Sequence, residues 1–354
     1  MTHAFNRDML MVARAARGFT QGDLADAASV TQALISKIEN GFILDPTPEM
    51  VSAFAHALKY PEEFFYSYEK PHGLPPFHFR KRASLGAKIL AKIEADINIR
   101  RIHIDRLMRS FESHTARDFP TIDLDLNQWT PRDAARHVRG LWMIPRGPIE
   151  DLTAVVERAG AVVVQIDFAT PKLDALSFRL PGKPPLIFMN SVVPGDRYRF
   201  SLAHELAHLI FHNHPETDET MEDEADEFAG ELLTPGSEVR PYLAYATLPK
   251  YGRAKQYWKV SIKSLIVQAS RLKVITPNLY TRLNVQYSKA GYGKFGEPFP
   301  IPVEKPSTLS RAISHHMQVL NYSPEEMAKL LMLTKEEFVS AYTERPRLRL
   351  VGRD

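Results

Sequence analysis

The chain has 354 residues, of which 44% are hydrophobic and 25% are charged, as in an ordinary globular protein. It contains no cysteine, which excludes a thiol nucleophile, a disulfide framework, an iron–sulfur cluster and a cysteine-based zinc finger, so any metal must be held by His, Asp or Glu. No run approaches about 18 consecutive apolar residues, and the N-terminus lacks the apolar segment of a secretory signal. We therefore expect a cytoplasmic protein of two or three domains.

The formal net charge of +3 conceals an uneven distribution of charge along the chain. Residues 121–239 hold 10 basic and 20 acidic side chains, whereas residues 240–354 hold 19 basic and 8 acidic ones. Residues 71–120 are also basic, with 10 Lys and Arg against 5 Asp and Glu. Such asymmetry points to nucleic-acid contact outside the acidic centre, and a solvated charge bias explains it about equally well.

Residues 6–66 are expected to form five short helices. Thr20 begins one of them, with Asp23 three residues later as in a capping box, and Thr31 begins the next, which ends before Gly41. Two short helices joined by a tight turn, the second buried on one side only, describe a helix-turn-helix. An ordinary helical hairpin with one polar face would show the same pattern.

The segment FTQGDLADAASVTQALISKIENG, followed by TPEMVSAFAHAL and PEEFF, resembles the XRE/Cro family of helix-turn-helix DNA-binding domains. The resemblance covers residues 6–66 and implies double-stranded DNA as a partner. It implies DNA contacts from a set of polar side chains: Gln21, Thr31, Gln32, Ser36, Lys37 and Asn40. Within this set Gln32 and Ser36 are the expected base readers, and the others are expected to cap the recognition helix or meet the phosphate backbone.

The middle of the chain alternates between β-rich and helical patterns. Apolar β-rich runs at 161–166, 175–180 and 186–190 precede a helical pattern over 196–212. This order predicts an α+β domain between two helical ends.

The predicted helix over 196–212 contains His204-Glu205-Leu206-Ala207-His208. Two histidines four residues apart share one helix face and can ligate one Zn²⁺. Glu205, beside the first of them, is placed to act as the general base toward water. A third protein ligand is needed, and the residues that offer a suitable atom downstream are His212, His214, Glu216, Asp218, Glu219, Glu222, Asp223, Glu224 and Asp226.

A second helix, over about 221–234 and stopped by Pro235, fits the third ligand best. Glu222 and Asp226 are four residues apart on it, so Glu222 can complete a His₂Glu site and Asp226 can accept the free N–H of a ligand histidine. Three further acidic residues of this run are expected on a solvated face: Asp223, Glu224 and Glu227.

The segments DRYRFSLAHELAHLIFH and EDEADEFAGELLTP closely resemble the ImmA/IrrE family of zinc metallopeptidases. The resemblance covers roughly residues 130–300. It implies a gluzincin-like site with His204, His208 and Glu222 as zinc ligands and Glu205 as general base. An XRE domain fused to such a peptidase also resembles phage and mobile-element regulators and antitoxin-like proteins.

These features predict a mainly helical α+β chain with four parts. We expect an XRE-type domain over 1–70, a basic helical linker over 71–120 that includes one long helix, a metallopeptidase domain over 121–300, and a helical region with a basic tail over 301–354. In the last part His315 and His316 are expected on the surface, and the tail is expected to bind phosphate or to be disordered: Arg345, Arg347 and Arg349.

The predicted function is a transcriptional regulator whose zinc endopeptidase domain cleaves a specific regulatory protein. The alternative is a DNA-binding repressor or antitoxin whose protease-like domain binds or senses a toxin, repressor or other partner without turnover. The oligomeric state stays open, and a homodimer would fit because helix-turn-helix proteins often read two half-sites. The residue that stabilises the oxyanion stays open among His212, His214, Tyr198 and Arg199.

Overall fold

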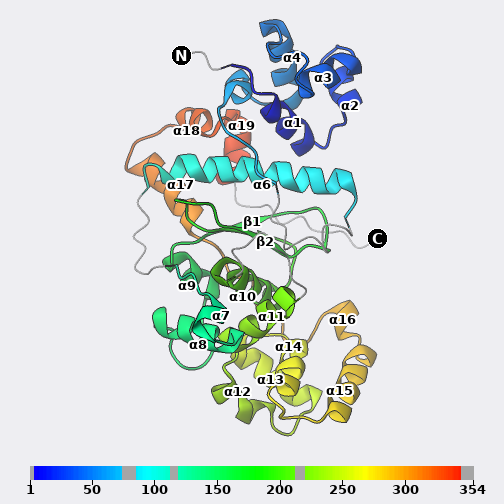
Figure 1. Ribbon diagram of the computed structural model, residues 1–354, viewed down its shortest axis with the longest axis vertical. Coiled ribbons are helices and arrows are strands. Elements are labelled where there is room, and N and C mark those ends of the chain that lie inside the picture. Colours follow the sequence, from blue (N-terminus) through cyan, green and yellow to red (C-terminus); the bar gives the residue numbers. More distant parts are fainter. Residues whose placement is uncertain (1–3, 74–84, 112–118, 212–219, 344–354) are drawn as a thin grey trace. The chain divides into compact units, whose positions relative to one another are not determined.

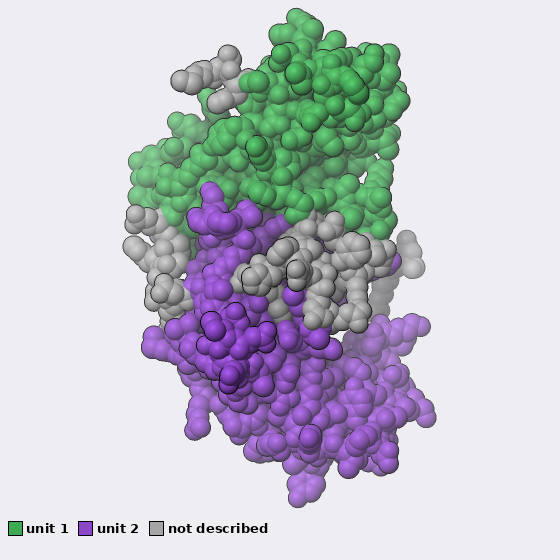
Figure 2. All heavy atoms as spheres, in the orientation of Figure 1, with its two compact units in different colours: residues 1–74, 82–113, 309–354 green, residues 75–81, 114–308 purple. Residues whose placement is uncertain are grey.

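The computed structural model describes residues 4–73, 85–111, 119–211 and 220–343. The chain divides into two compact units, coloured in Figure 2. Unit 1 comprises residues 1–74, 82–113 and 309–354, and unit 2 comprises residues 75–81 and 114–308. The elements are mainly helices with one small sheet, which confirms the predicted α+β class.

Unit 1 begins with the five expected helices (Figure 1): α1 Arg7–Ala16, α2 Gln21–Ala27, α3 Gln32–Glu39, α4 Pro48–Leu58 and the 3₁₀ helix η1 Glu62–Tyr66. Their starts are fixed by side-chain caps. Thr20 and Asp23 form a full capping box on α2, and the Thr31 and Thr47 hydroxyls accept the Leu34 and Met50 amides at the starts of α3 and α4.

The long helix α6 (Ala87–Met108) packs into the same unit as α17 (Thr308–Gln318), α18 (Pro324–Leu331), α19 (Lys335–Phe338) and the π-helical turn η3 (Val339–Thr343). Ile99 of α6, Phe54 of α4 and Met327 of α18 belong to one hydrophobic cluster. The compact units therefore differ from the four segments expected along the chain, because apolar faces far apart in sequence share a core. That the four segments are independently folding domains stays a prediction.

Several basic side chains of α6 are used inside unit 1. Lys92 bonds to Asp96 at 2.8 Å, Arg101 donates to the Lys70 carbonyl at 2.7 Å, and Arg106 donates to the Leu330 carbonyl at 3.0 Å. Asp96 lies on α6 itself, Lys70 lies in the chain that follows η1, and Leu330 belongs to α18.

One expectation for the C-terminal helices is wrong. His316 is only 1% exposed: its Nδ1 lies 2.8 Å from the Ala312 carbonyl oxygen, and the ring centre of Tyr322, in the chain after α17, lies 5.6 Å from its own. The basic residues expected in the tail, Arg345, Arg347 and Arg349, lie outside the described residues.

Unit 2 opens with α7 (Leu124–Asn127), α8 (Pro131–Leu141) and α9 (Leu152–Arg158). The sheet follows, formed by β1 (Val162–Ile166), β2 (Ala175–Phe178) and β3 (Leu186–Asn190) in the order β1-β3-β2. β1 runs parallel to β3, and β2 runs antiparallel to it with Ser177 opposite Ile187.

Two helices then pack together beside the sheet: α10 (Gly195–Phe211), which contacts β2 and β3, and α11 (Thr220–Leu233), which lies along α10 (Figure 1). The helices that complete the unit are α12 Gly236–Leu243, α13 Leu248–Trp258, α14 Ile262–Arg271, α15 Pro277–Lys289 and α16 Tyr292–Phe295. Residues of α8, α10, α11, α13 and α14 share the main core. No described helix is long and apolar enough to cross a bilayer.

Candidate metal centre and nucleic-acid interface

Helix α10 carries three polar side chains in the interior of unit 2. Its apolar residues, such as Leu202 and Leu206, are fully buried, which fixes the helix against the core. His204, Glu205 and His208 are nevertheless only 7%, 1% and 1% exposed. Buried polar groups are stable only when they find partners, so these three side chains must be satisfied locally.

Glu222 of α11 meets the two histidines. The Nε2 atoms of His204 and His208 lie 3.1 Å apart. One carboxylate oxygen of Glu222 lies 3.7 Å from Nε2 of His204, and the other lies 3.4 Å from Nε2 of His208. Ligands arranged tetrahedrally at about 2.0–2.1 Å from a zinc ion lie about 3.3 Å from one another, so these three donors have the spacing of a metal site. The three groups could hold a metal ion.

The other ring nitrogen of His204 is occupied by Asp226. Its Nδ1 lies 2.9 Å from Oδ1 of Asp226, one helical turn after Glu222 on α11. Because a carboxylate can only accept, this contact places the ring proton on Nδ1, so Nε2, which lies beside His208 and Glu222, carries the lone pair that could ligate a metal. The backbone of the same turn is held by Arg271, whose guanidinium donates to the Asp226 carbonyl at 2.8 Å.

Glu205 is oriented by a residue that the sequence pattern did not indicate. The hydroxyl of Ser177 on β2 donates to Oε2 of Glu205 at 2.6 Å, and Ser177 is fully buried. A serine in a short apolar strand carries no signal of such a contact, because the pairing depends on how β2 packs against α10.

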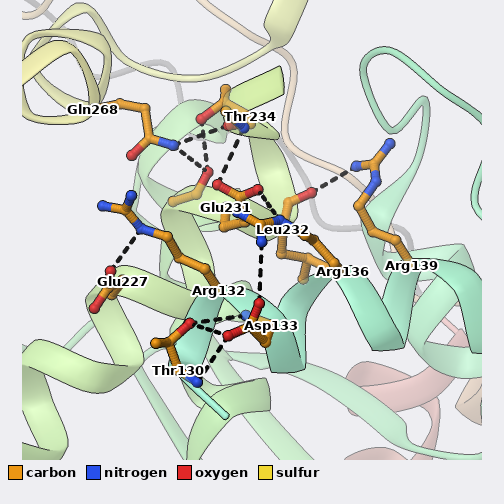
Figure 3. Close-up of polar contacts among 12 residues, drawn as sticks. Thr130, Arg132, Asp133, Arg136, Arg139, Glu227, Glu231, Leu232, Thr234 and Gln268 are labelled. Carbon is orange, nitrogen blue, oxygen red and sulfur yellow. Dashed lines mark hydrogen bonds and ion pairs between the residues drawn. The ribbon is translucent and has the colours of Figure 1, made fainter. Parts of the chain in front are cut away.

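A polar clamp between α8 and α11 holds the helix that supplies Glu222 and Asp226 (Figure 3). Arg136 donates to Glu231 at 2.9 Å, and Arg139 donates to the Leu232 carbonyl at 2.7 Å. Arg132 lies 2.6 Å from Glu227, which is only partly exposed because α8 packs along that side of α11. Asp223 is exposed as expected.

The candidates for oxyanion stabilisation fall into two groups. Tyr198 and Arg199 are buried and used elsewhere: the Thr153 hydroxyl bonds to that of Tyr198 at 3.3 Å, and Arg199 pairs with Glu304 and donates to the Ile149 carbonyl. The remaining candidates, together with other potential ligands from the same stretch, lie outside the described residues: His212, His214, Glu216, Asp218 and Glu219.

In unit 1 the polar face of α3 is open. Gln32, Lys37 and Asn40 are exposed, and Ser36 is half-buried. Thr31 is exposed as well, but its hydroxyl already caps the helix by accepting the Leu34 amide at 3.2 Å. The face therefore presents donors and acceptors that suit base edges and phosphates.

The start of this face is ordered by a chain of hydrogen bonds. Gln32 donates to Gln21 at 3.1 Å, and Gln21 donates to Glu39 at 2.8 Å. Glu39 is 7% exposed and is held by Arg14, whose Nε donates to it at 2.6 Å. Arg14 and Glu39, which fix the orientation of Gln21, were not predicted from the sequence.

Comparison with family models agrees with this arrangement. Residues 10–65 match the model described as helix-turn-helix, and residues 156–270 match the model described as the IrrE N-terminal-like domain. The chain joins an XRE-type helix-turn-helix domain to an IrrE-like peptidase-family domain. No curated protein matched the chain.

The IrrE-like match includes β1 to β3, α10, α11 and α14, and hence all residues of the candidate metal centre. Helix α6 lies outside both matches. Lys88 of α6 nevertheless borders the helix-turn-helix domain, since it lines one hollow with Gln21 and Gln32. The pKa of Asp23 lies below its ordinary value, mainly because of its hydrogen bonds with Thr20, and Lys88 lowers it further.

Proposed function

We propose that this protein is a DNA-binding regulator whose IrrE-like domain is a zinc-dependent endopeptidase that cleaves a specific regulatory protein. The observation that carries the proposal is the convergence of His204, His208 and Glu222 with the carboxylate of Glu205 between the two histidines in sequence. Three protein ligands leave the fourth position of a tetrahedral metal open, as catalytic sites require.

The chain's own residues account for most of the proposed reaction. When bound, zinc would supply Lewis acidity that polarises a scissile carbonyl and makes water nucleophilic near neutral pH. Glu205 takes the proton from the attacking water and passes it to the leaving amide nitrogen. Ser177 donates to one Glu205 oxygen and so orients the carboxylate that accepts the proton. Asp226 fixes the tautomer of His204.

The DNA-binding part of the proposal rests on the helix-turn-helix match and on the open polar face of α3. Gln32 and Ser36 are the proposed base readers, with Gln21, Lys37 and Asn40 on the phosphates. Thr31 acts through the helix start that it caps. A homodimer on two half-sites stays part of the proposal. Selection of binding sites from random duplexes should give a defined motif with the wild type and a relaxed one with Gln32→Ala.

The peptidase part is tested with Glu205→Gln, which keeps the size of the side chain and removes the base. Zinc content is measured in both proteins, and new protein N-termini are mapped in cells that express either one. The proposal expects equal zinc and cleavage products that occur with the wild type only. Equal zinc with identical N-termini and identical regulation would overturn it in favour of the alternative, a repressor or antitoxin that binds a toxin or other partner without turnover.

A further inference from the structure

A cavity of about 770 Å³ in unit 2 opens beside the candidate metal centre. Asp226, whose carboxylate lies 2.9 Å from His204, forms part of its wall. Phe200, one helical turn before His204 on α10, forms another part. Most of the rest of the wall comes from α13 to α16 and the chain that follows them, and the start of α10 and Gly230 of α11 complete it. A polypeptide that reaches the metal centre therefore has this cavity next to its path.

The cavity has an excess of positive charge. Five cationic side chains line it, against three carboxylates from Asp196, Asp226 and Glu297. Lys255 is 1% exposed and uses two of these carboxylates, at 2.5 Å from Asp196 and 2.9 Å from Glu297. The third carboxylate bonds to His204. Each of the three carboxylates in the wall thus already has a partner within the protein.

Three of the five cations in the wall lack a carboxylate partner among the described residues. Arg197 pairs with Asp174 outside the cavity wall, whereas Lys263, Lys294 and Arg271 have no carboxylate within ion-pair distance among the described residues. Lys263 donates to the Asn284 amide oxygen, and Arg271 donates to a backbone carbonyl. Neither neutral acceptor cancels the charge, so these cations can attract an anionic group from outside.

Aromatic rings stand beside these cations. Lys263 lies 5.8 Å from the ring centre of Tyr287, and Lys294 lies 5.1 Å from that of Phe295. Phe295 is 81% exposed although its ring is large and apolar. Together with Phe200, these rings give the cavity apolar surface to cover the stem of a bound side chain and its neighbours.

We infer that this cavity is a recognition subsite for an acidic segment of the cleaved protein, in which Asp or Glu side chains bind Lys263, Lys294 and Arg271 and a flanking apolar residue packs on the aromatic rings. The assignment of the segment to a substrate rests on the proposed peptidase function. A peptide fits better than a nucleic acid, because a cavity of about 770 Å³ with apolar rings beside its cations takes one or two acidic side chains and an apolar neighbour, whereas a continuous phosphate backbone needs an extended basic groove.

The test uses the full-length, zinc-loaded Glu205→Gln protein and two fluorescein-labelled peptides, each with Gly-Ser flanks. One has the core Leu-Glu-Asp-Phe, and the other has the uncharged core Leu-Gln-Asn-Phe. Fluorescence anisotropy should give about tenfold tighter binding of the acidic peptide, equivalent to about 1.4 kcal/mol. The double variant Lys263→Gln, Lys294→Gln should lose this preference, while Lys289→Gln, an exposed lysine of α15 outside the cavity, should keep it.

The outcomes separate this inference from the proposed function. Equal affinity for both peptides, or a preference that survives in the double variant, overturns the acidic subsite even if Glu205-dependent cleavage occurs. Tighter binding of a twelve-nucleotide oligothymidylate that the double variant abolishes would overturn it in favour of nucleic acid. If cleavage never occurs but the acidic preference depends on Lys263 and Lys294, the subsite stands as a partner-binding site and the peptidase proposal fails.

Discussion

Gly195, the first residue of α10, lies where the chain after α16 passes very close to the helix that carries the metal-site histidines. An ideal Cβ on Gly195 would lie 2.2 Å from the carbonyl oxygen of Ile301 and 2.5 Å from that of Pro302. Both are backbone atoms, which cannot rotate away as a side chain can. Because the φ of Gly195 is outside the left-handed region, Ala suits the backbone and only the space forbids it.

The loss of stability caused by Gly195→Ala depends on the contacts that a shift of residues 301–302 would disturb. Two residues on, Glu304 accepts the amides of Leu152 at 3.1 Å and Thr153 at 2.7 Å and pairs with the buried Arg199. Overpacking costs about 1–3 kcal/mol, and the upper end applies when such contacts are stretched. Ala gains about 1 kcal/mol over Gly in a helix. Gly195→Ala should therefore lower the free energy of unfolding by about 2 kcal/mol, or about 4–8 °C in Tm for a unit of this size.

Tryptophan fluorescence measures this change selectively, because the chain has three tryptophans and all of them, Trp129, Trp142 and Trp258, lie in unit 2. Gly140→Ala is the matched control: this glycine is in α8, and no atom lies within 4 Å of the position that its Cβ would take. That variant should gain about 0.5–1 kcal/mol. If both variants melt at or above the wild-type temperature, the close approach of residues 301–302 to α10 is refuted.

Three further predictions concern the metal, pH and DNA. Asp226→Ala should weaken zinc binding about 10–100-fold in a chelator competition. Asp223→Ala, at an exposed position of the same helix, should leave zinc binding unchanged. Equal zinc affinities of the two variants would show that Asp226 does not support the metal site. The pKa of His103 lies well below its ordinary value, chiefly because burial disfavours the imidazolium. The free energy of unfolding should therefore decrease as the pH drops from about 6.5, by up to about 1.4 kcal/mol per pH unit. His103→Gln should flatten this slope in urea unfolding followed by circular dichroism, and an unchanged slope would contradict the assignment. Lys88→Gln should weaken DNA binding uniformly across sequences and reduce the salt slope of log K by about 0.9, and an unaltered slope would exclude Lys88 from the phosphates.

The residues that sequence predicts well are those related by one helical period. His204 and His208 share a face of α10 because they are four apart, and the same spacing puts Glu222 and Asp226 on one face of α11. The caps at Thr20 and Thr31 are equally local. For such features the helix itself fixes the geometry, so a single sequence is enough.

Features that depend on packing between distant segments were not predictable. Ser177 reaches Glu205 only because β2 lies against α10, 28 residues away. His316 was predicted to lie on the surface because a sequence pattern shows which face of a helix is polar but not which segment covers it, and it is buried against Tyr322. The ion pair of Glu227 with Arg132 of α8 was likewise not indicated by the sequence.

The same limit applies to charge. The basic stretch over 71–120 points toward DNA, yet Lys92, Arg101 and Arg106 are spent on contacts inside unit 1. Of the basic residues on α6, Lys88 is the one that shares a hollow with the helix-turn-helix residues Gln21 and Gln32.

Several of the excess basic residues of 240–354 lie together in one cavity. Lys255, Lys263, Arg271 and Lys294 all come from this stretch, and they line one cavity, whereas the acidic stretch before it supplies Glu222 and Asp226. Residues of the acidic stretch and of the basic stretch thus lie next to each other, with the carboxylates toward the metal ligands and the cations beside them. This arrangement favours an acidic protein segment over DNA as the group that meets those cations, because a cavity beside apolar rings takes one or two acidic side chains, whereas a continuous phosphate backbone needs an extended basic groove.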